Sequence, residues 1–229
     1  MIRILSIETS TEVCSVAVHE EGQLLAYAES RRQKSHSSLL VPMVDQLLAN
    51  SKIQKTELSA IAVSKGPGSY TGLRIGTSTA KGLCYALDIP LIAIDTLQAM
   101  ALEASQHLQL PSYIIPLIDA RRAEAYSQVF DHHMAMISEP SAVILDEASF
   151  TELDQSNHQV FVGDGAAKAK GLLGRRDNAS FWGHILPSAK YIGLLAVQSY
   201  HRDQFEDLAY FEPFYLKEFY TPKPPKKLV

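Results

Sequence analysis

Glycine and hydroxyl-bearing residues gather in one stretch of the chain. Gly66, Gly68 and Gly72 stand there with Ser69 and Thr71, after an apolar run and before a helical pattern. The backbone amides of such a loop can bind an anion at a helix N-terminus, and Ser69 or Thr71 can cap the helix. The stretch is not a P-loop, because no Gly-Lys-Ser/Thr follows, and its G-x-G-x-x-x-G spacing departs from the dinucleotide fingerprint. A tight turn that only directs the helix is the alternative, and both interpretations stay open.

Two carboxylates end apolar, strand-like runs at related positions of the chain. Glu8 follows residues 2–7, and Asp119 follows residues 113–118. If both strand ends face one cleft, the two acids could hold magnesium and a phosphate, with Ser10 close to Glu8. Solvated acids at strand ends are as common, so this interpretation also stays open.

The other residue types that carry out catalysis do not form a known pattern. His36 has Leu40 one helical turn later, so no pair of helical histidines arises there. His132 and His133 are adjacent and would point to opposite faces of a strand. The sequence has no G-x-S-x-G serine elbow and no Cys-x-x-Cys pair. We therefore expect no metal site and no complete catalytic centre.

The composition is that of an ordinary globular protein. Of 229 residues, 46% are hydrophobic and 20% are charged, and the net charge is −4. With this charge the chain as a whole does not attract nucleic acid electrostatically, so another subunit or a local basic patch must supply most of the affinity for any RNA. Cys14 and Cys84 lie in apolar runs and are expected to be reduced core thiols. The N-terminal segment turns polar after seven residues and no run spans a membrane, so we expect a cytoplasmic protein.

The hydrophobic patterns predict a related order of elements twice, βββαβα. In the first half we expect strands at 2–7, 13–19, 24–29, 60–64 and 90–94, and helices at 38–50, 71–87 and, capped by Thr96, 96–104. In the second half we expect strands at 113–118, 123–130, 134–137, 143–145 and 160–162, and helices at 166–173 and 188–203. This repetition predicts a duplicated α/β architecture with a cleft between its halves. The expected parts are residues 1–106, residues 107–215 and a Pro/Lys-rich tail at 216–229, with the last helix free to pack on the first half.

The helix after the glycine-rich loop carries small residues at every fourth position. Gly72, Gly76 and Ala80 share one face, and each interior glycine weakens a helix by about 0.5–1 kcal/mol relative to alanine. Close approach by another element, of the same domain or of a second subunit, would offset that cost. Arg74 lies near the helix start, where it opposes the helix dipole, which suggests an anion or carboxylate partner beside the commoner exposed salt bridge.

Four stretches resemble the TsaB (YeaZ) family, and the similarity runs over nearly the whole chain. They are ILSIETSTEVCSVAV at 4–18, SKGPGSYTGLRIG at 64–76, IDARRAEAY at 118–126 and EPFYLK at 212–217. The second stretch, placed after a strand, is the most specific. The resemblance implies an actin-like fold, of the sugar-kinase, Hsp70 and actin type with RNase H-like halves.

The resemblance also implies a function in making threonylcarbamoyladenosine in tRNA, at the adenosine just 3′ of the anticodon. In that family TsaB is the non-catalytic partner of TsaD, which holds the metal and transfers the threonylcarbamoyl group. TsaE, an ATPase, completes the assembly, and TsaC makes the threonylcarbamoyl-adenylate. TsaB also forms homodimers through the N-terminal face that binds TsaD, and tRNA is reached through the complex.

The residues at matching positions agree with a non-catalytic role. The metal-binding His-x-x-x-His pair of TsaD matches Thr96 and Met100 of this sequence. The turns after Glu8 and Asp119 lack the glycine that admits a phosphate in actin-like kinases. We therefore expect no cofactor of the chain's own, and ATP or ADP, if used, at the junction with TsaD.

Two sets of site residues are predicted. The partner surface comprises two helices, with His36, Leu39, Leu40, Met43 and Leu47 on the first and Gly72, Arg74, Ile75, Gly76, Thr79 and Ala80 on the second. The nucleotide or anion set comprises Glu8, Ser10, Gly66, Gly68, Ser69, Thr71, Asp119, Gly163 and Gly165, the last two flanking a remnant of an adenosine loop. One face of each helix must also cover its own sheet, and the sequence does not divide the two faces.

Two other functions compete with the accessory subunit. An independent ATP-dependent phosphotransferase would use Glu8 and Asp119 to hold magnesium. A peptidase is the third possibility, because relatives in the wider family were labelled glycoproteases, but no metal pair or activated nucleophile supports it.

Overall fold

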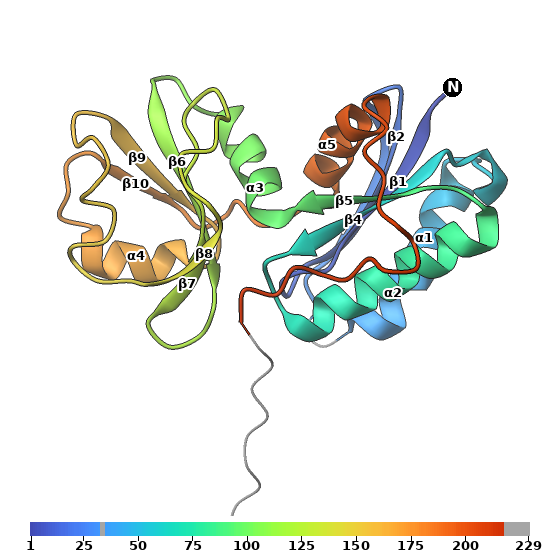
Figure 1. The fold of residues 1–229 in the computed structure, drawn as a ribbon, viewed down its shortest axis with the longest axis horizontal. Helices are drawn as coiled ribbons and strands as arrows, with labels where there is room; N and C mark the ends of the chain where they lie inside the picture. The colour runs from blue at the N-terminus through green and yellow to red at the C-terminus, as the bar shows by residue number, and fades with distance from the viewer. Residues whose placement is uncertain (33–34, 218–229) are drawn as a thin grey trace, which may run out of the picture.

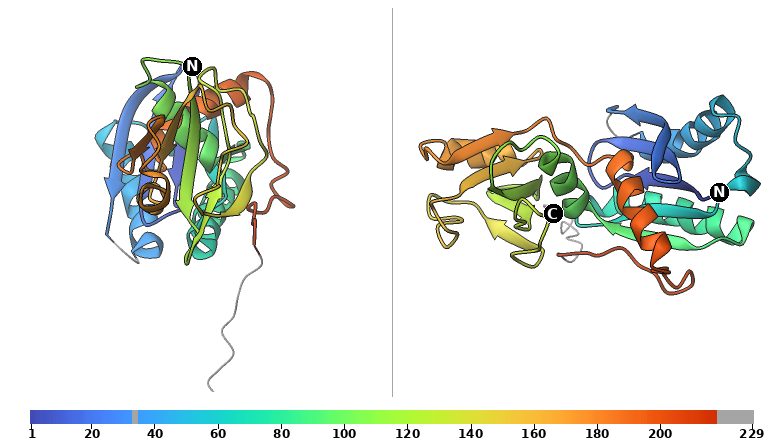
Figure 2. Two further views of the ribbon diagram at one scale, coloured as in Figure 1. Left: turned by 90° about the vertical axis from the view of Figure 1, so that its left-hand side faces the viewer. Right: turned by 90° about the horizontal axis from the view of Figure 1, so that it is seen from above.

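The computed structural model describes residues 1–32 and 35–217, which form two lobes side by side, each built on a five-stranded sheet (Figures 1 and 2). In the first sheet β1 pairs antiparallel with β2 and parallel with β4, and the strand order is β3-β2-β1-β4-β5. Its strands are β1 Arg3–Glu8, β2 Cys14–Glu20, β3 Gln23–Ser30, β4 Ala60–Gly66 and β5 Leu91–Asp95.

The second sheet repeats this topology. Its order is β10-β9-β6-β7-β8, with β6 antiparallel to β7 and parallel to β9. Its strands are β6 Ser112–Asp119, β7 Glu124–Ser127, β8 Ser141–Ile144, β9 His158–Val162 and β10 Ala179–Trp182. The predicted duplicated α/β architecture is confirmed, because β1 and β6 hold the same central place in the two sheets.

Helices cover both faces of each sheet. Alternate side chains of β1 explain this layering, since Leu5 and Ile7 enter the core under α1 and α2 whereas Ile4 packs with α5. In the second sheet α4 covers one face and α3 the other. The helices are α1 His36–Asn50, α2 Tyr70–Leu87, α3 Thr96–Ser105, α4 Ala166–Leu173 and α5 Ala189–His201, with a short 3-10 helix at Lys55–Glu57.

Two helices connect the lobes. Leu97 and Met100 of α3 belong to the core of the second lobe, while Ala99 of the same helix packs with Ile192 of α5 against the first sheet. The last helix therefore lies on the first lobe, although the chain has passed through the second (Figure 1).

Several predicted elements need correction. The strand expected at 123–130 ends at Ser127, and 134–137 forms only a single bridge, between Phe130 and Met136. Strand β10 was not predicted, because its four residues gain their strand conformation from parallel pairing with β9. Asp95, not Thr96, caps α3 by accepting hydrogen bonds from the amides at positions 97 and 98.

Two further predictions concern the whole chain. The predicted tail at 216–229 lies outside the described residues from position 218 onward. Within residues 1–32 and 35–217, no helix combines the length and the apolar character needed to cross a bilayer.

Candidate functional site

The glycine-rich loop is fastened to the turn that follows β1. The amide of Ser69 donates to the carbonyl oxygen of Ser10 at 2.6 Å, and the hydroxyl of Ser69 accepts from the amide of Gly72. A Cβ atom on Gly68 would lie 2.3 Å from the same Ser10 carbonyl oxygen. Ser69 is thus the helix cap, and its own amide already has an acceptor within the chain. The loop therefore fits the interpretation as a tight turn that directs α2 better than that of an anion cradle.

The small-residue face of α2 packs against the same turn. A Cβ on Gly72 would lie 2.0 Å from the carbonyl oxygen of Thr9, and one on Gly76 would lie 2.3 Å from its hydroxyl. That hydroxyl donates to the carbonyl oxygen of Gly72 at 2.8 Å, and Ala80 is fully buried beyond it. The prediction that these three residues meet a partner is wrong, because they face the chain's own sheet and offer no open surface.

At other glycines of the predicted anion set, a backbone carbonyl group of the chain itself also occupies the space where a side chain would begin. Gly163 has a φ of +105°, and a Cβ there would lie 2.3 Å from the carbonyl oxygen of Leu117. The amide of Gly165 donates to that same oxygen at 3.0 Å. Gly66 has a φ of +115°, and a Cβ there would lie 2.5 Å from the carbonyl oxygen of Phe214. Each position thus requires glycine for packing or for backbone conformation.

The two acids do not meet in one open cleft. Glu8 is completely buried, its Oε1 accepts from the amide of Ser10 at 2.5 Å, and burial raises the pKa of its carboxyl. Asp119 is exposed and pairs with the ammonium group of Lys168 at 2.6 Å. It also accepts from the amide of Arg121 at 2.6 Å. The prediction that Glu8 could face a magnesium–phosphate cleft is wrong, since the surrounding chain encloses its carboxylate.

The positions that match the metal pair of TsaD are part of the core. Thr96 and Met100 are 0% and 1% exposed. Among residues 1–32 and 35–217, no group of three or more His, Cys, Asp or Glu side chains could hold a metal ion. Cys14 and Cys84 are free and buried, as predicted, and burial raises their thiol pKa values to about 11 and about 12.

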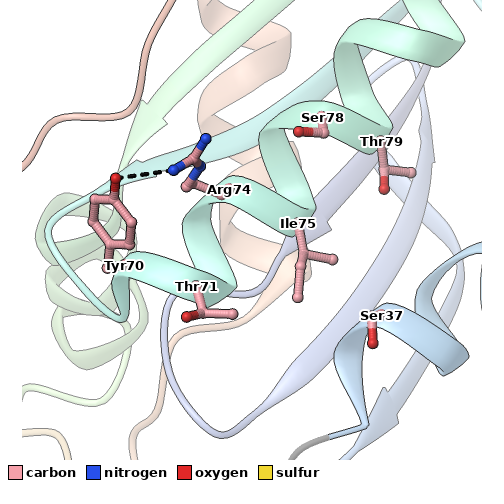
Figure 3. Close-up of a pocket in the computed structure, with 7 residues that line it drawn as sticks. All are labelled: Ser37, Tyr70, Thr71, Arg74, Ile75, Ser78 and Thr79. Carbon is pink, nitrogen blue, oxygen red and sulfur yellow. Dashed lines mark hydrogen bonds between the residues drawn. The ribbon is translucent and has the colours of Figure 1, made fainter. Parts of the chain in front are cut away.

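The outward faces of α1 and α2 enclose two adjoining hollows, which together we call the α1–α2 groove. The first has a volume of about 500 Å³, and Ser37 from α1 faces the first turns of α2 across it (Figure 3). The second, of about 200 Å³, continues toward the middle of both helices and shares Ser78 and Thr79 with the first. The lining residues of the first are Ser37, Tyr70, Thr71, Arg74, Ile75, Ser78 and Thr79; those of the second add Val41, Val44, Asp45, Lys55, Gly82 and Leu83.

The groove contains only part of the predicted partner surface. Arg74, Ile75 and Thr79 line it, as expected for a face that the sheet does not use. Leu39 and Met43 of α1 are half-buried. The other predicted members of α1 are buried and belong to the chain's own fold: His36, Leu40 and Leu47.

Sequence reasoning left out several exposed residues that line this groove, among them Ser37, Val41, Ser78 and Gly82. Val41 is 50% exposed. Gly82 is exposed in the interior of α2, and a Cβ there would meet nothing within 4 Å. The available signal was the helical spacing of Ile75, Thr79 and Gly82, which places Gly82 on the outward face rather than on the face of Gly72 and Gly76.

Comparisons with known proteins agree on proteins that make threonylcarbamoyladenosine in tRNA. Residues 29–210 match the family model described as TsaD, tRNA N6-adenosine threonylcarbamoyltransferase. The tRNA threonylcarbamoyladenosine biosynthesis protein TsaB of Haemophilus influenzae is 33% identical over 232 residues, covering 96% of this chain and 95% of that protein. The structure of YeaZ from Pseudomonas aeruginosa is 28% identical, with a TM-score of 0.81 over 94% of this chain and 100% of that chain.

A more distant structure shares the fold alone. It is the activator of the 2-hydroxyisocaproyl-CoA dehydratase from Clostridium difficile with bound ADPNP, at 11% identity and a TM-score of 0.52 over 89% of this chain and 96% of that chain. Together with the duplicated sheet order, this likeness places the chain in the actin-like fold class.

Proposed function

We propose a function for this chain from the premise that it belongs to the TsaB family of tRNA threonylcarbamoyladenosine biosynthesis proteins. Family membership gives the chain a role in forming that modified nucleoside in tRNA. Our proposal concerns how it acts: it is a non-catalytic subunit that binds TsaD through the α1–α2 groove and so supports threonylcarbamoyl transfer. TsaE joins the same assembly, and the chain acts on tRNA through this complex.

The α1–α2 groove is the observation that carries this proposal. Val41, which is 50% exposed, lines the second hollow, and a partner could cover it there. Gly82 adds an independent argument, because an interior helix glycine costs about 1 kcal/mol relative to alanine and no contact within the described chain requires it. Close approach of a partner helix at Gly82 would explain why a side chain is missing there.

A non-catalytic role agrees with how the chain uses its other candidate residues. Glu8 is enclosed, Asp119 is paired with Lys168, and the glycine loops receive the chain's own carbonyl groups. These contacts stabilise the chain's own fold. We propose that any ATP or ADP binds at the junction with TsaD, and that the same groove mediates a homodimer when TsaD is absent.

The test compares two exposed helical glycines. Gly82→Trp fills the α1–α2 groove, whereas Gly171→Trp places the same side chain in open space on α4 of the other lobe. In calorimetric titrations with TsaD of the same organism, we expect Gly82→Trp to weaken binding at least tenfold, about 1.4 kcal/mol, and Gly171→Trp to leave it unchanged. Circular dichroism of both variants checks the fold. Equal affinities for both variants would rule out the groove as the docking site.

Function is tested by reconstituting tRNA modification with and without this chain. We expect modification to require the chain and to fall with Gly82→Trp but not with Gly171→Trp. The competing phosphotransferase makes a different prediction: ATP turnover by the purified chain alone, abolished by Asp119→Asn. That result, together with undiminished tRNA modification when the chain is omitted, would overturn our proposal.

A further inference from the structure

The C-terminal segment at 204–217, which we call the strap, descends from α5 on the side of the first lobe that faces the viewer in Figure 1 and then runs along α2 toward the second lobe (Figures 1 and 2). The amide of Glu206 donates to the carbonyl oxygen of Leu91 at 2.9 Å, so the strap pairs with the outer edge of β5 at the start of that strand. Farther on, the ammonium group of Lys81 on α2 donates to the carbonyl oxygen of Phe211 at 3.0 Å. These contacts fasten the strap along α2.

The lower part of the strap meets the loop that precedes α2. The amide of Phe214 donates to the carbonyl oxygen of Lys65 at 2.7 Å. Gly66 must be glycine here, since a Cβ would lie 2.5 Å from the carbonyl oxygen of Phe214. Lys217 then forms an ion pair with Glu124 of β7, in the second lobe. The strap thus connects both lobes to the first turn of α2.

One side chain of the strap reaches the residues that line the α1–α2 groove. The ring of Tyr215 packs on the ring of Tyr70, with 4.7 Å between centroids. The hydroxyl of Tyr70 accepts a hydrogen bond from Nη1 of Arg74 at 3.0 Å, and the guanidinium carbon lies 5.4 Å from the Tyr70 ring centroid (Figure 3). Tyr215 of the strap therefore contacts Tyr70, and Tyr70 contacts the guanidinium group of Arg74 in the groove.

We propose that Tyr215 is a positioning residue, which fixes the ring of Tyr70 and through it presents the Arg74 guanidinium to a carboxylate of the partner in the groove. The inference rests on the proposed function, because it assigns a role within the same docking site. Arg74 is exposed and lines the groove, and within residues 1–32 and 35–217 no ion pair includes it. An arginine that is already oriented loses less side-chain freedom when it binds.

The experiment is a double-mutant cycle on the full chain, with binding to TsaD measured by calorimetry. We expect Tyr215→Ala to weaken binding about three- to tenfold, and Tyr215→Phe, which keeps the ring, to restore it. In an Arg74→Ala background, Tyr215→Ala should have no further effect, because a positioning residue acts only through the group that it positions. The affinity of Tyr215→Ala should also depend less on salt concentration than that of the wild type.

Each outcome decides between distinct failures. If Arg74→Ala leaves binding unchanged while Gly82→Trp weakens it, the inference about Arg74 and Tyr215 is overturned and the docking site stands. If neither substitution weakens binding, the proposed docking site itself is wrong. If Arg74→Ala weakens binding but Tyr215→Ala does not, or if the two effects multiply, only the positioning role is overturned. Lys217→Ala controls for a folding defect, because it releases the far end of the strap without changing a contact on α2. If it lowers affinity modestly in the wild type but not in the Arg74→Ala background, the proposal is supported. If it lowers affinity equally in both backgrounds, the proposal is contradicted.

Discussion

Two glycines six positions apart in α2 should respond in opposite directions to the same substitution. Replacing Gly76 by alanine places a Cβ 2.3 Å from the hydroxyl oxygen of Thr9, which donates to the carbonyl oxygen of Gly72. Losing that buried hydrogen bond costs about 1–3 kcal/mol, and crowding costs about 1–3 kcal/mol. The gain in helix propensity is about 1 kcal/mol. We therefore expect Gly76→Ala to lower the free energy of unfolding by about 1–5 kcal/mol.

Gly82→Ala should have the opposite effect on the isolated chain. A Cβ there meets nothing within 4 Å, so the helix-propensity gain of about 0.5–1 kcal/mol is not opposed by a contact. The assay is urea unfolding followed by circular dichroism, at concentrations low enough to exclude self-association, with the slope of the transition compared among variants. A Gly76→Ala variant as stable as the wild type, or both variants shifting in the same direction, would refute the division of α2 into a core face and an outward face.

Three further predictions concern buried polar groups and a helix cap. Burial lowers the pKa of His19 to about 4, so the unfolded chain binds a proton that the folded chain does not. The free energy of unfolding should therefore decrease by up to about 3 kcal/mol as the pH is lowered from about 6.5 to 4. In thermal melts, the stability of His19→Gln should decrease less over this pH range than that of the wild type. Burial raises the pKa of Glu8, so its contribution to stability is lost as pH rises above about 4.5. Glu8→Gln should then melt at a higher temperature than the wild type at pH 8, with the difference vanishing near pH 4, and a lower melting temperature at pH 8 would contradict this. Asp95→Ala removes the cap of α3 and should lower the free energy of unfolding by about 1 kcal/mol in urea titrations, whereas an unchanged value would show that the cap contributes nothing.

Much of the fold follows from local patterns in the sequence. Alternating hydrophobic residues identify the strands of the first lobe, and the change to helical spacing after Ser38 identifies α1. The glycine-rich stretch indicates the start of α2. Ser69, one of the two cap residues predicted, caps this helix. Because these signals depend only on residues near one another in the chain, the repeated order of elements was predictable.

The second lobe was less predictable for a physical reason. Strand β10 has four residues, and its place at the sheet edge depends on parallel pairing with β9, some twenty positions earlier. The residues after Ser127 alternate like a strand, yet only Phe130 forms bridges there. Short edge elements depend on tertiary partners, so their propensities alone do not determine them.

The sequence by itself determined that α2 carries glycine and alanine at helical spacing, and therefore that some element approaches it closely. Only the tertiary structure decided which element this is. The close contact comes from Thr9, 63 positions before Gly72, at the end of a strand that the sequence could place but not orient against the helix. Periodicity states which residues share a face, but the face that the sheet occupies depends on long-range packing. That packing buries Gly72 and Gly76 and leaves Arg74, Thr79 and Gly82 for the groove.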